Sequence, residues 1–219
     1  MPQDLAFTSR HAFRQRQRAL RRSLSPTQQH QAALDLKDRL LALPYLARPC
    51  HIALYLPFDG EPDTRPLITA LWQRGHQVAL PVLHLFSRGQ LLFLRYTPET
   101  AMRRNAFGIH EPCLDATRVV PLARLDLMLT PLVAFDTAGN RLGMGGGFYD
   151  RTLAPWRPRR QRGLGPYPIG IAHDCQRVAT LPVADWDVPL PEIITPSAHY
   201  RWPQAGAMED TPHAAPSPG

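Results

Sequence analysis

The sequence predicts a layered α/β/α domain, in which helices cover both faces of a largely parallel sheet. Strand-like apolar runs alternate with helical segments along the chain, which is typical of this fold class. A glycine-rich segment also follows directly on one apolar run, at the carboxyl end of a predicted strand, where such sheets bind their ligands. The 219 residues, of which 44% are hydrophobic and 20% charged, suffice for one domain with a core.

The N-terminal half supplies the first alternating elements. Residues 10–24 are rich in arginine and predict a basic helix, and residues 1–9 before it are expected to be flexible. Ser25 and Gln28 form a capping box that starts a second helix, and Pro44 ends that helix. Further along we expect strands over 51–58, 77–83 and 90–96, and a helix over 64–74.

The C-terminal half continues the pattern. Residues 125–135 form an apolar run that Pro131 interrupts, and turn-forming residues follow at 136–140. We then expect a helix over 148–153, a loop over 157–168, and short strands over 169–172 and 193–195. From residue 203 the chain is rich in Pro, Ala, Ser and Gly, which is typical of disorder. We therefore predict one domain over 10–202, with a flexible segment at 1–9 and a disordered tail at 203–219.

The charge of the chain favours anionic ligands. The 25 Lys and Arg residues outnumber 18 Asp and Glu, for a net charge of +7, and Lys37 is the only lysine. No glycine lies near Lys37, so the chain lacks the lysine-containing loop that binds phosphates in many nucleotide-binding proteins. Arginines and backbone amides would have to hold a nucleotide. An arginine-rich composition without functional meaning explains the charge total equally well.

Cysteine usage and hydropathy predict a cytoplasmic protein. The three cysteines Cys50, Cys113 and Cys175 are scattered, which argues against a disulfide framework or a zinc site. No apolar run approaches the roughly 18 residues of a membrane span. The basic N-terminal segment is not followed by the apolar stretch of a secretory signal. We therefore expect neither membrane association nor secretion.

Four glycines within residues 143–147 form the clearest candidate for a ligand loop. Glycines permit positive φ and a close approach of the backbone, so that successive amides and a helix N-terminus can converge on an anion. Arg141 before the loop and Arg151 after it add positive charge. A flexible turn is the alternative. The spacing differs from the dinucleotide-binding pattern, because Phe148 stands where its last glycine would be.

Three acidic residues are candidates for binding roles. Asp150 follows the glycine-rich loop, and a carboxylate beside a polyphosphate requires a cation such as Mg²⁺ between them. Asp187 is a candidate for a second metal-binding carboxylate. Glu61 follows the first predicted strand and could accept hydrogen bonds from a polar heterocycle. The alternatives are a helix-terminal or capping role for the two aspartates, and a solvated loop acid for Glu61.

Arg10 and Arg14 lie one turn apart on the predicted N-terminal helix and could clamp phosphate oxygens. A solvated basic helix or a nucleic-acid-binding arm explains the same pattern. His173, Asp174 and Cys175 lie side by side in the sequence, but no third catalytic partner is identifiable, which favours a structural role.

Taken together, these segments resemble the 5-formyltetrahydrofolate cyclo-ligase family, also called methenyltetrahydrofolate synthetase, in its enterobacterial type. The most specific block comprises residues 131–136, Gly139 and residues 141–151. Supporting blocks follow the family's order between about residues 10 and 196, at 60–64, 107–112, 170–176, 186–190 and 193–195.

The resemblance implies a NagB/RpiA/CoA transferase-like fold and a ligase of one-carbon metabolism. It implies closure of 5-formyltetrahydrofolate to 5,10-methenyltetrahydrofolate, with ATP as co-substrate, Mg²⁺ as cofactor, and ADP and phosphate as products. In the family's chemistry the formyl oxygen is phosphorylated, N10 attacks the activated carbon, and phosphate leaves. Such a reaction depends on alignment of the reacting groups and neutralisation of charge.

The resemblance also implies roles for residues of this chain. The expected catalytic residues are Arg141 and Tyr149. The expected ATP-binding residues are Arg10, Arg14, Arg141, Leu142, Gly143, Met144, Gly145, Gly146, Gly147, Phe148 and Tyr149. The expected folate-binding residues are Leu56, Glu61, Met144, Gly145, Gly146, Gly147 and Phe148. Asp150 and Asp187 match the magnesium-associated carboxylates.

Two departures from the family keep other functions open. Some members carry Arg and Lys where this chain has Met144 and Gly146. A non-catalytic folate- or nucleotide-binding relative is therefore one alternative. The other is a nucleic-acid-binding module that uses the N-terminal arginines, although no aromatic residues suited to base stacking alternate with them. For the cyclo-ligase we expect a monomer that acts on a small molecule, without nucleic acid or membrane partners.

Overall fold

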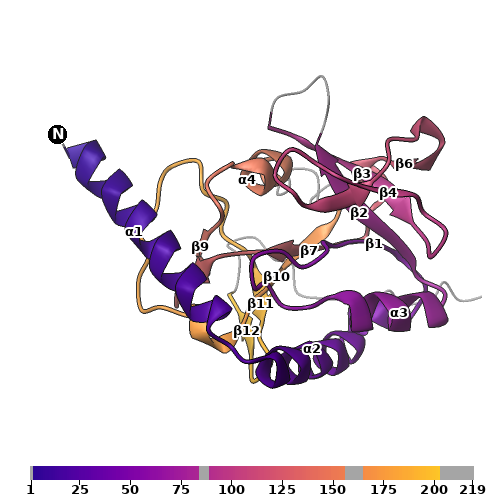
Figure 1. Ribbon diagram of the computed structural model, residues 1–219, viewed down its shortest axis with the longest axis horizontal. Coiled ribbons are helices and arrows are strands. Elements are labelled where there is room, and N and C mark those ends of the chain that lie inside the picture. Colours follow the sequence, from indigo (N-terminus) through magenta and orange to yellow (C-terminus); the bar gives the residue numbers. More distant parts are fainter. Residues whose placement is uncertain (1, 84–88, 156–164, 203–219) are drawn as a thin grey trace, which may run out of the picture.

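The fold is built on one eight-stranded mixed sheet (Figure 1), seen in a computed structural model that describes residues 2–83, 89–155 and 165–202. The strand order is β12-β11-β10-β7-β1-β2-β3-β6. The strands are β1 (His51–Ala53), β2 (Gln77–Leu83), β3 (Leu91–Tyr96), β6 (Val119–Val120), β7 (Leu127–Pro131), β10 (Tyr167–Ile171), β11 (Glu192–Ile194) and β12 (His199–Arg201).

The five central strands are parallel and the edge strands are antiparallel. Ile52 of β1 pairs with Val78 of β2 on one side and with Leu127 of β7 on the other. Strands β10 and β11 continue the parallel arrangement beyond β7. Strands β3, β6 and β12 are antiparallel to their neighbours. The prediction of a largely parallel sheet is confirmed.

In the described residues, four α-helices surround the sheet. They are α1 (Pro2–Arg22), α2 (Pro26–Leu41), α3 (Arg65–Gln73) and α4 (Phe148–Leu153). The capping box of α2 is present, because the Ser25 hydroxyl accepts from the Gln28 amide and the Gln28 side chain accepts from the Ser25 amide. Short 3₁₀ turns occur at Pro44–Leu46, Ala116–Arg118, Leu122–Arg124 and Asp174–Gln176.

Alternate residues of each central strand enter two cores on opposite faces of the sheet, as the two-residue period of a strand requires. Ile52 packs in a core that includes Leu36 and Leu40 of α2 and Leu71 of α3. Its neighbour Ala53 packs in the other core. That second core also holds Leu153 of α4 and aromatic residues of the C-terminal segment. Figure 1 shows α2 and α3 on one side of the sheet and α4 on the other, so helices lie on both faces.

The structure corrects several predicted boundaries. Helix α1 begins at Pro2 rather than at residue 10, and ends at Arg22. Strand β1 ends at Ala53, because the backbone of residues 54–60 leaves the sheet to form a turn in which Asp59 and Gly60 have positive φ. The predicted loop 157–168 overlaps β10, which starts at Tyr167, and its residues 157–164 lie outside the described residues. The predicted tail at 203–219 also lies outside them.

Two hairpins outside the main sheet were not expected from the sequence. One joins β4 (Met102–Arg104) to β5 (His110–Pro112), and the other joins β8 (Ala134–Phe135) to β9 (Arg141–Leu142). Each has strands of only two or three residues, too short to give a periodic pattern. The second hairpin leads directly into the glycine-rich loop and so fixes where that loop begins.

In the described parts of the chain, no helix is long and apolar enough to cross a membrane. Cys50, Cys113 and Cys175 are free thiols.

Candidate functional site

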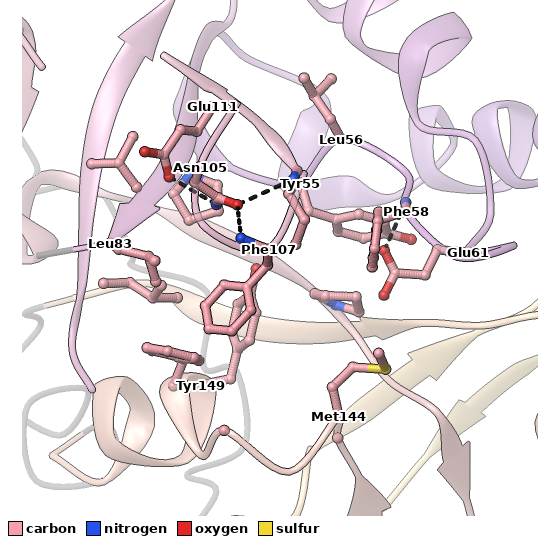
Figure 2. A pocket seen from close by; sticks show the side chains of 18 of the residues that line it. Tyr55, Leu56, Phe58, Glu61, Leu83, Asn105, Phe107, Glu111, Met144 and Tyr149 are labelled. Carbon is pink, nitrogen blue, oxygen red and sulfur yellow. Dashed lines mark hydrogen bonds between the residues drawn. The ribbon is translucent and has the colours of Figure 1, made fainter. Parts of the chain in front are cut away.

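A cavity of about 350 Å³ opens at the carboxyl ends of the central strands. Its walls come from the segment after β1, the end of β2, the β4–β5 hairpin, the segment 143–147 and the first turn of α4. Figure 2 shows side chains from these separate elements pointing into the same space. This position is the one expected for a ligand in a parallel α/β sheet.

Glu61 provides a buried carboxyl group on one wall of the cavity. It is 8% exposed, and its Oε2 accepts from the Phe58 amide at 3.1 Å. Burial raises the pKa of Glu61 and outweighs the opposing effect of the nearby Arg21 guanidinium, so that the resulting pKa is about 7. Leu56 lines the same wall. A carboxyl group in this apolar setting, once ionised, would bind strongly to paired N–H donors of a ligand.

The glycine-rich loop passes the opposite wall in a conformation that needs glycine at two positions. Gly145 has φ +104° and Gly147 has φ +64°, and Gly147 is the N-cap residue of α4. At Gly146, an added Cβ would lie 2.6 Å from the Phe148 ring. The residues of the segment that line the cavity are Gly143, Met144, Gly146, Gly147 and Phe148.

An ion pair between Arg141 and Asp150 lies beside this loop. Arg141 Nη2 donates to Asp150 Oδ1 at 2.7 Å, and the arginine side chain is 2% exposed. The Val188 amide also donates to Asp150 Oδ1, while Oδ2 has no hydrogen-bond partner among the described residues. Arg141 Nε is buried without a partner in the described part of the chain. An anionic ligand in the cavity would supply an acceptor for that donor.

Tyr149 lines the cavity next to this ion pair. Burial raises the pKa of its hydroxyl well above the ordinary value, and the charge of Glu61 raises it further. The hydroxyl is therefore neutral throughout the neutral pH range. Tyr149 can donate a hydrogen bond but cannot act as an anion there.

Arg10 and Arg14 lie outside the cavity lining but hold the segments that border it. Arg10 forms a two-pronged ion pair with Asp187, with N–O distances of 2.5 and 2.9 Å, and also donates to the Pro182 carbonyl. Arg14 Nε donates to the Gly143 carbonyl at 2.9 Å. The two arginines therefore connect α1 to the 182–187 loop and to the glycine-rich loop.

The structure brings together most of the predicted site residues. Ten of them line the cavity: Leu56, Glu61, Arg141, Gly143, Met144, Gly146, Gly147, Phe148, Tyr149 and Asp150. Arg10, Arg14, Leu142, Gly145 and Asp187 are not in its lining. The Leu142 side chain is buried in a separate small core with Ala134 and Leu181.

The β4–β5 hairpin contributes cavity residues that sequence reasoning missed. Phe107 is 59% exposed and projects from the hairpin towards α4, which carries Tyr149 (Figure 2). The Asn105 side chain holds the hairpin loop by accepting from the amides of Phe107 and Ile109, and it donates to Glu111. Residues 107–112 matched a family block, but nothing in their spacing indicated that they would face residues 143–149.

Comparisons with known proteins agree with one another. A family model described as the 5-formyltetrahydrofolate cyclo-ligase family matches residues 6–196. The 5-formyltetrahydrofolate cyclo-ligase of Escherichia coli K12 is 51% identical over 185 residues, which cover 84% of this chain and 99% of that protein. The Haemophilus influenzae cyclo-ligase is 49% identical over 84% of this chain and 96% of its own length.

Solved structures give the same result. The NMR structure of Aquifex aeolicus 5,10-methenyltetrahydrofolate synthetase superposes with a TM-score of 0.73 at 26% identity, covering 94% of this chain and 99% of that one. The corresponding Mycoplasma pneumoniae enzyme gives a TM-score of 0.66 at 26% identity, covering 85% of this chain and 98% of that one.

Proposed function

The chain belongs to the 5-formyltetrahydrofolate cyclo-ligase family, and on that premise we propose that it converts 5-formyltetrahydrofolate and ATP into 5,10-methenyltetrahydrofolate, ADP and phosphate. The observation that carries the proposal is the shared cavity: the glycine-rich loop expected to bind phosphates and the buried Glu61 expected to bind the pterin face the same space. A reaction between two bound substrates requires that proximity.

The reaction needs the γ-phosphate of ATP to meet the formyl oxygen. That oxygen attacks phosphorus, the bond to ADP breaks, and the formyl carbon becomes susceptible to attack by N10. A C–N bond then forms, the C–O bond to phosphate breaks, and the N10 proton is released. The chain's part is to align the two substrates and to stabilise negative charge on the transferred group.

We assign the pterin ring to the wall that carries Glu61. The ionised carboxylate would accept hydrogen bonds from the pterin N–H and amino group, and Leu56 would contact the ring. Met144, Gly145, Gly146, Gly147 and Phe148 would border the folate from the other side. Four of these five lie in the cavity lining, which supports the assignment.

We assign the ATP phosphates to the glycine-rich loop and the arginines around it. The amides of Leu142 and of residues 143–147 would surround the phosphates, and Arg141 would donate from its Nε, which has no partner among the described residues. Arg10 and Arg14 would add charge at the rim of the loop, where they already contact Asp187 and Gly143. Tyr149 would hydrogen-bond the transferring group, since its hydroxyl stays protonated.

The residues present fit Mg²⁺ that arrives with the nucleotide. The described residues contain no group of three or more His, Cys, Asp or Glu side chains arranged to hold a metal ion by themselves. Mg²⁺ is commonly held by one or two carboxylates together with phosphates and water, and Asp150 offers a free Oδ2 at the cavity. When bound there, Mg²⁺ would neutralise charge on the β- and γ-phosphates. Asp187 is the second candidate, but both of its oxygens now accept from Arg10, so Arg10 would have to turn away.

The nucleic-acid alternative loses support because several of the N-terminal arginines are already in ion pairs. Arg10 pairs with Asp187, and both Arg18 and Arg21 pair with Asp59. A nucleic-acid-binding arm needs arginines that are free to neutralise phosphates. We also propose a monomeric, cytoplasmic enzyme. Its free thiols fit a reducing compartment, and light scattering after size-exclusion chromatography tests the monomer.

The test is an absorbance assay for the methenyl product with 5-formyltetrahydrofolate, ATP and Mg²⁺, each omitted in turn. We expect product and ADP in equal amounts only in the complete mixture. Binding of both substrates without product would establish the non-catalytic alternative. Glu61→Gln should raise the folate KM more than the ATP KM, whereas Glu99→Gln, at an exposed glutamate outside the cavity, should change neither.

A further inference from the structure

Arg21 is a fully buried cation with no role in the reaction proposed above. Its side chain is 0% exposed, although the adjacent Leu20 and Arg22 are exposed. Arg21 Nε donates to the Asp59 carbonyl at 2.8 Å and Nη1 donates to the Leu132 carbonyl at 3.2 Å. Nη2 donates to Asp59 Oδ2 at 3.1 Å. These bonds hold the plane of the guanidinium in one orientation.

The same guanidinium contacts both walls of the cavity. Nη2 lies 3.7 Å from Glu61 Oε1, and it also donates to the Met144 sulfur at 3.8 Å. Arg21 is thus the buried positive charge within ion-pair distance of the acid that we assign to the pterin. Such a charge is costly to bury, and the hydrogen bonds from Nε, Nη1 and Nη2 offset part of that cost.

We propose that Arg21 is the positioning residue for Glu61: through its contact with Oε1 it orients this carboxyl group and holds it in the ionised form that accepts two hydrogen bonds from the pterin. The inference rests on the proposed function, because it assumes that Glu61 binds the pterin edge. Arg21 itself does not line the cavity and acts through Glu61.

Charged and titratable groups surround Glu61 from several elements. Arg18 and Arg21 approach from α1, and Asp59 approaches from the same turn. Tyr55 and Tyr149 face it from the segment after β1 and from α4, and both remain neutral because burial raises the pKa of each hydroxyl. Arg21 is therefore the nearest charge that favours ionised Glu61, and Asp59 is the charge that opposes it.

The experiment is the pH dependence of kcat/KM for 5-formyltetrahydrofolate at saturating ATP and Mg²⁺. In the wild type, the acid limb should have its midpoint near the pKa of Glu61 in the free enzyme. This limb should be absent in Glu61→Gln. In Arg21→Met, loss of an opposite charge should raise the midpoint by about one pH unit or more. A shift of one unit from a midpoint of about 7 predicts an activity about fivefold lower at pH 7 and close to wild type at pH 9.

Arg18→Met is the matched control. Arg18 belongs to the same helix and pairs with the same aspartate at 2.6 Å, but it is 33% exposed and makes no ion pair with Glu61. Arg18 also lowers the pKa of Glu61, so its removal should raise the midpoint too, but by clearly less than the removal of Arg21, because Arg18 is partly exposed and water screens its charge. If Arg21→Met lowers activity equally at every pH and leaves the midpoint in place, Arg21 is only structural and the proposal is wrong.

Two further measurements keep the test decisive. If Arg21→Met does not fold, Arg21→Gln takes its place: it removes the same positive charge but keeps a polar amide for the Asp59 and Leu132 carbonyls. The midpoint should rise as in Arg21→Met, and an unchanged midpoint would overturn the proposal. An NMR titration of ¹³C-labelled glutamate carboxyls in the unliganded protein, assigned with Glu61→Gln, reads the same shifts without turnover. Absence of the methenyl product would therefore count against the proposed function. An unchanged Glu61 pKa in the Arg21 variant would count against the role of Arg21.

Discussion

Gly146→Ala tests whether the position of the Phe148 ring determines folate binding. The added Cβ would lie 2.6 Å from Phe148 Cε2 and 2.8 Å from Cδ2. A contact below about 3.4 Å between carbons is strongly repulsive, so the ring has to move by roughly 1 Å. The Arg151 guanidinium lies over the same ring, 5.7 Å from its centroid, and limits where it can go.

A displacement of this size at a substrate-positioning group can lower activity by up to about 100-fold. For a ring that borders only part of the folate, we expect kcat/KM for 5-formyltetrahydrofolate to fall about tenfold, or about 1.4 kcal/mol of transition-state stabilisation. The ATP KM should change much less, because the backbone of the loop keeps its conformation. Neither Gly143 nor Gly146 has a positive φ, so alanine causes no backbone strain at either position.

The assay is the initial rate of methenyl product formation over a range of folate concentrations, with Gly143→Ala as the control. Gly143 belongs to the same loop, yet an added Cβ there meets nothing within 4 Å. Thermal unfolding of both variants should stay within about 2 °C of wild type, as for substitutions away from a core. If Gly146→Ala retains activity within about twofold of Gly143→Ala, the Phe148 ring does not position the folate and our assignment of this wall is wrong.

Three further predictions follow from particular contacts. Asp150→Asn should raise the Mg²⁺ concentration for half-maximal activity at least about tenfold while the protein stays folded, and an unchanged Mg²⁺ titration would remove Asp150 from the metal site. Glu61→Gln should stabilise the protein at pH 8 but not at pH 5. The pKa of Glu61 is about 7 in the folded protein and 4.5 in the unfolded chain, so the unfolding free energy of the wild type falls by roughly 2–3 kcal/mol between these pH values, whereas glutamine does not titrate. Urea unfolding at the two pH values measures this, and an equal difference at both would contradict it. Gly170→Ala should cost about 2 kcal/mol and lower the Tm by roughly 4–8 °C, because its Cβ would lie 2.8 Å from Ile193 and Leu190 in the core; a Tm equal to that of Gly143→Ala would show that this core yields.

Patterns contained within short stretches of the chain were predictable from the sequence. The α2 capping box, the bounds of β2 and α4, and the parallel centre of the sheet follow from local propensity and hydrophobic periodicity. The glycine-rich loop was identifiable because its composition is unusual and follows an apolar run. Very short strands such as β4 and β5 escaped prediction, since three residues carry too little periodicity.

Contacts between distant segments were decided only by the tertiary structure. The sequence shows Arg21 as one more arginine of a basic helix, and Glu61 as an acid in a loop 40 positions later in the chain. They lie close together because α1 packs against the turn after β1. Both side chains are buried there, so the attraction between their charges is stronger than it would be in water. Likewise, Asp187 resembles a metal ligand in sequence, but the fold brings Arg10 onto both of its oxygens. The sequence therefore identifies which chemical groups are available to the site. The burial and the partners of each group depend on packing between distant segments, which no short stretch of sequence determines.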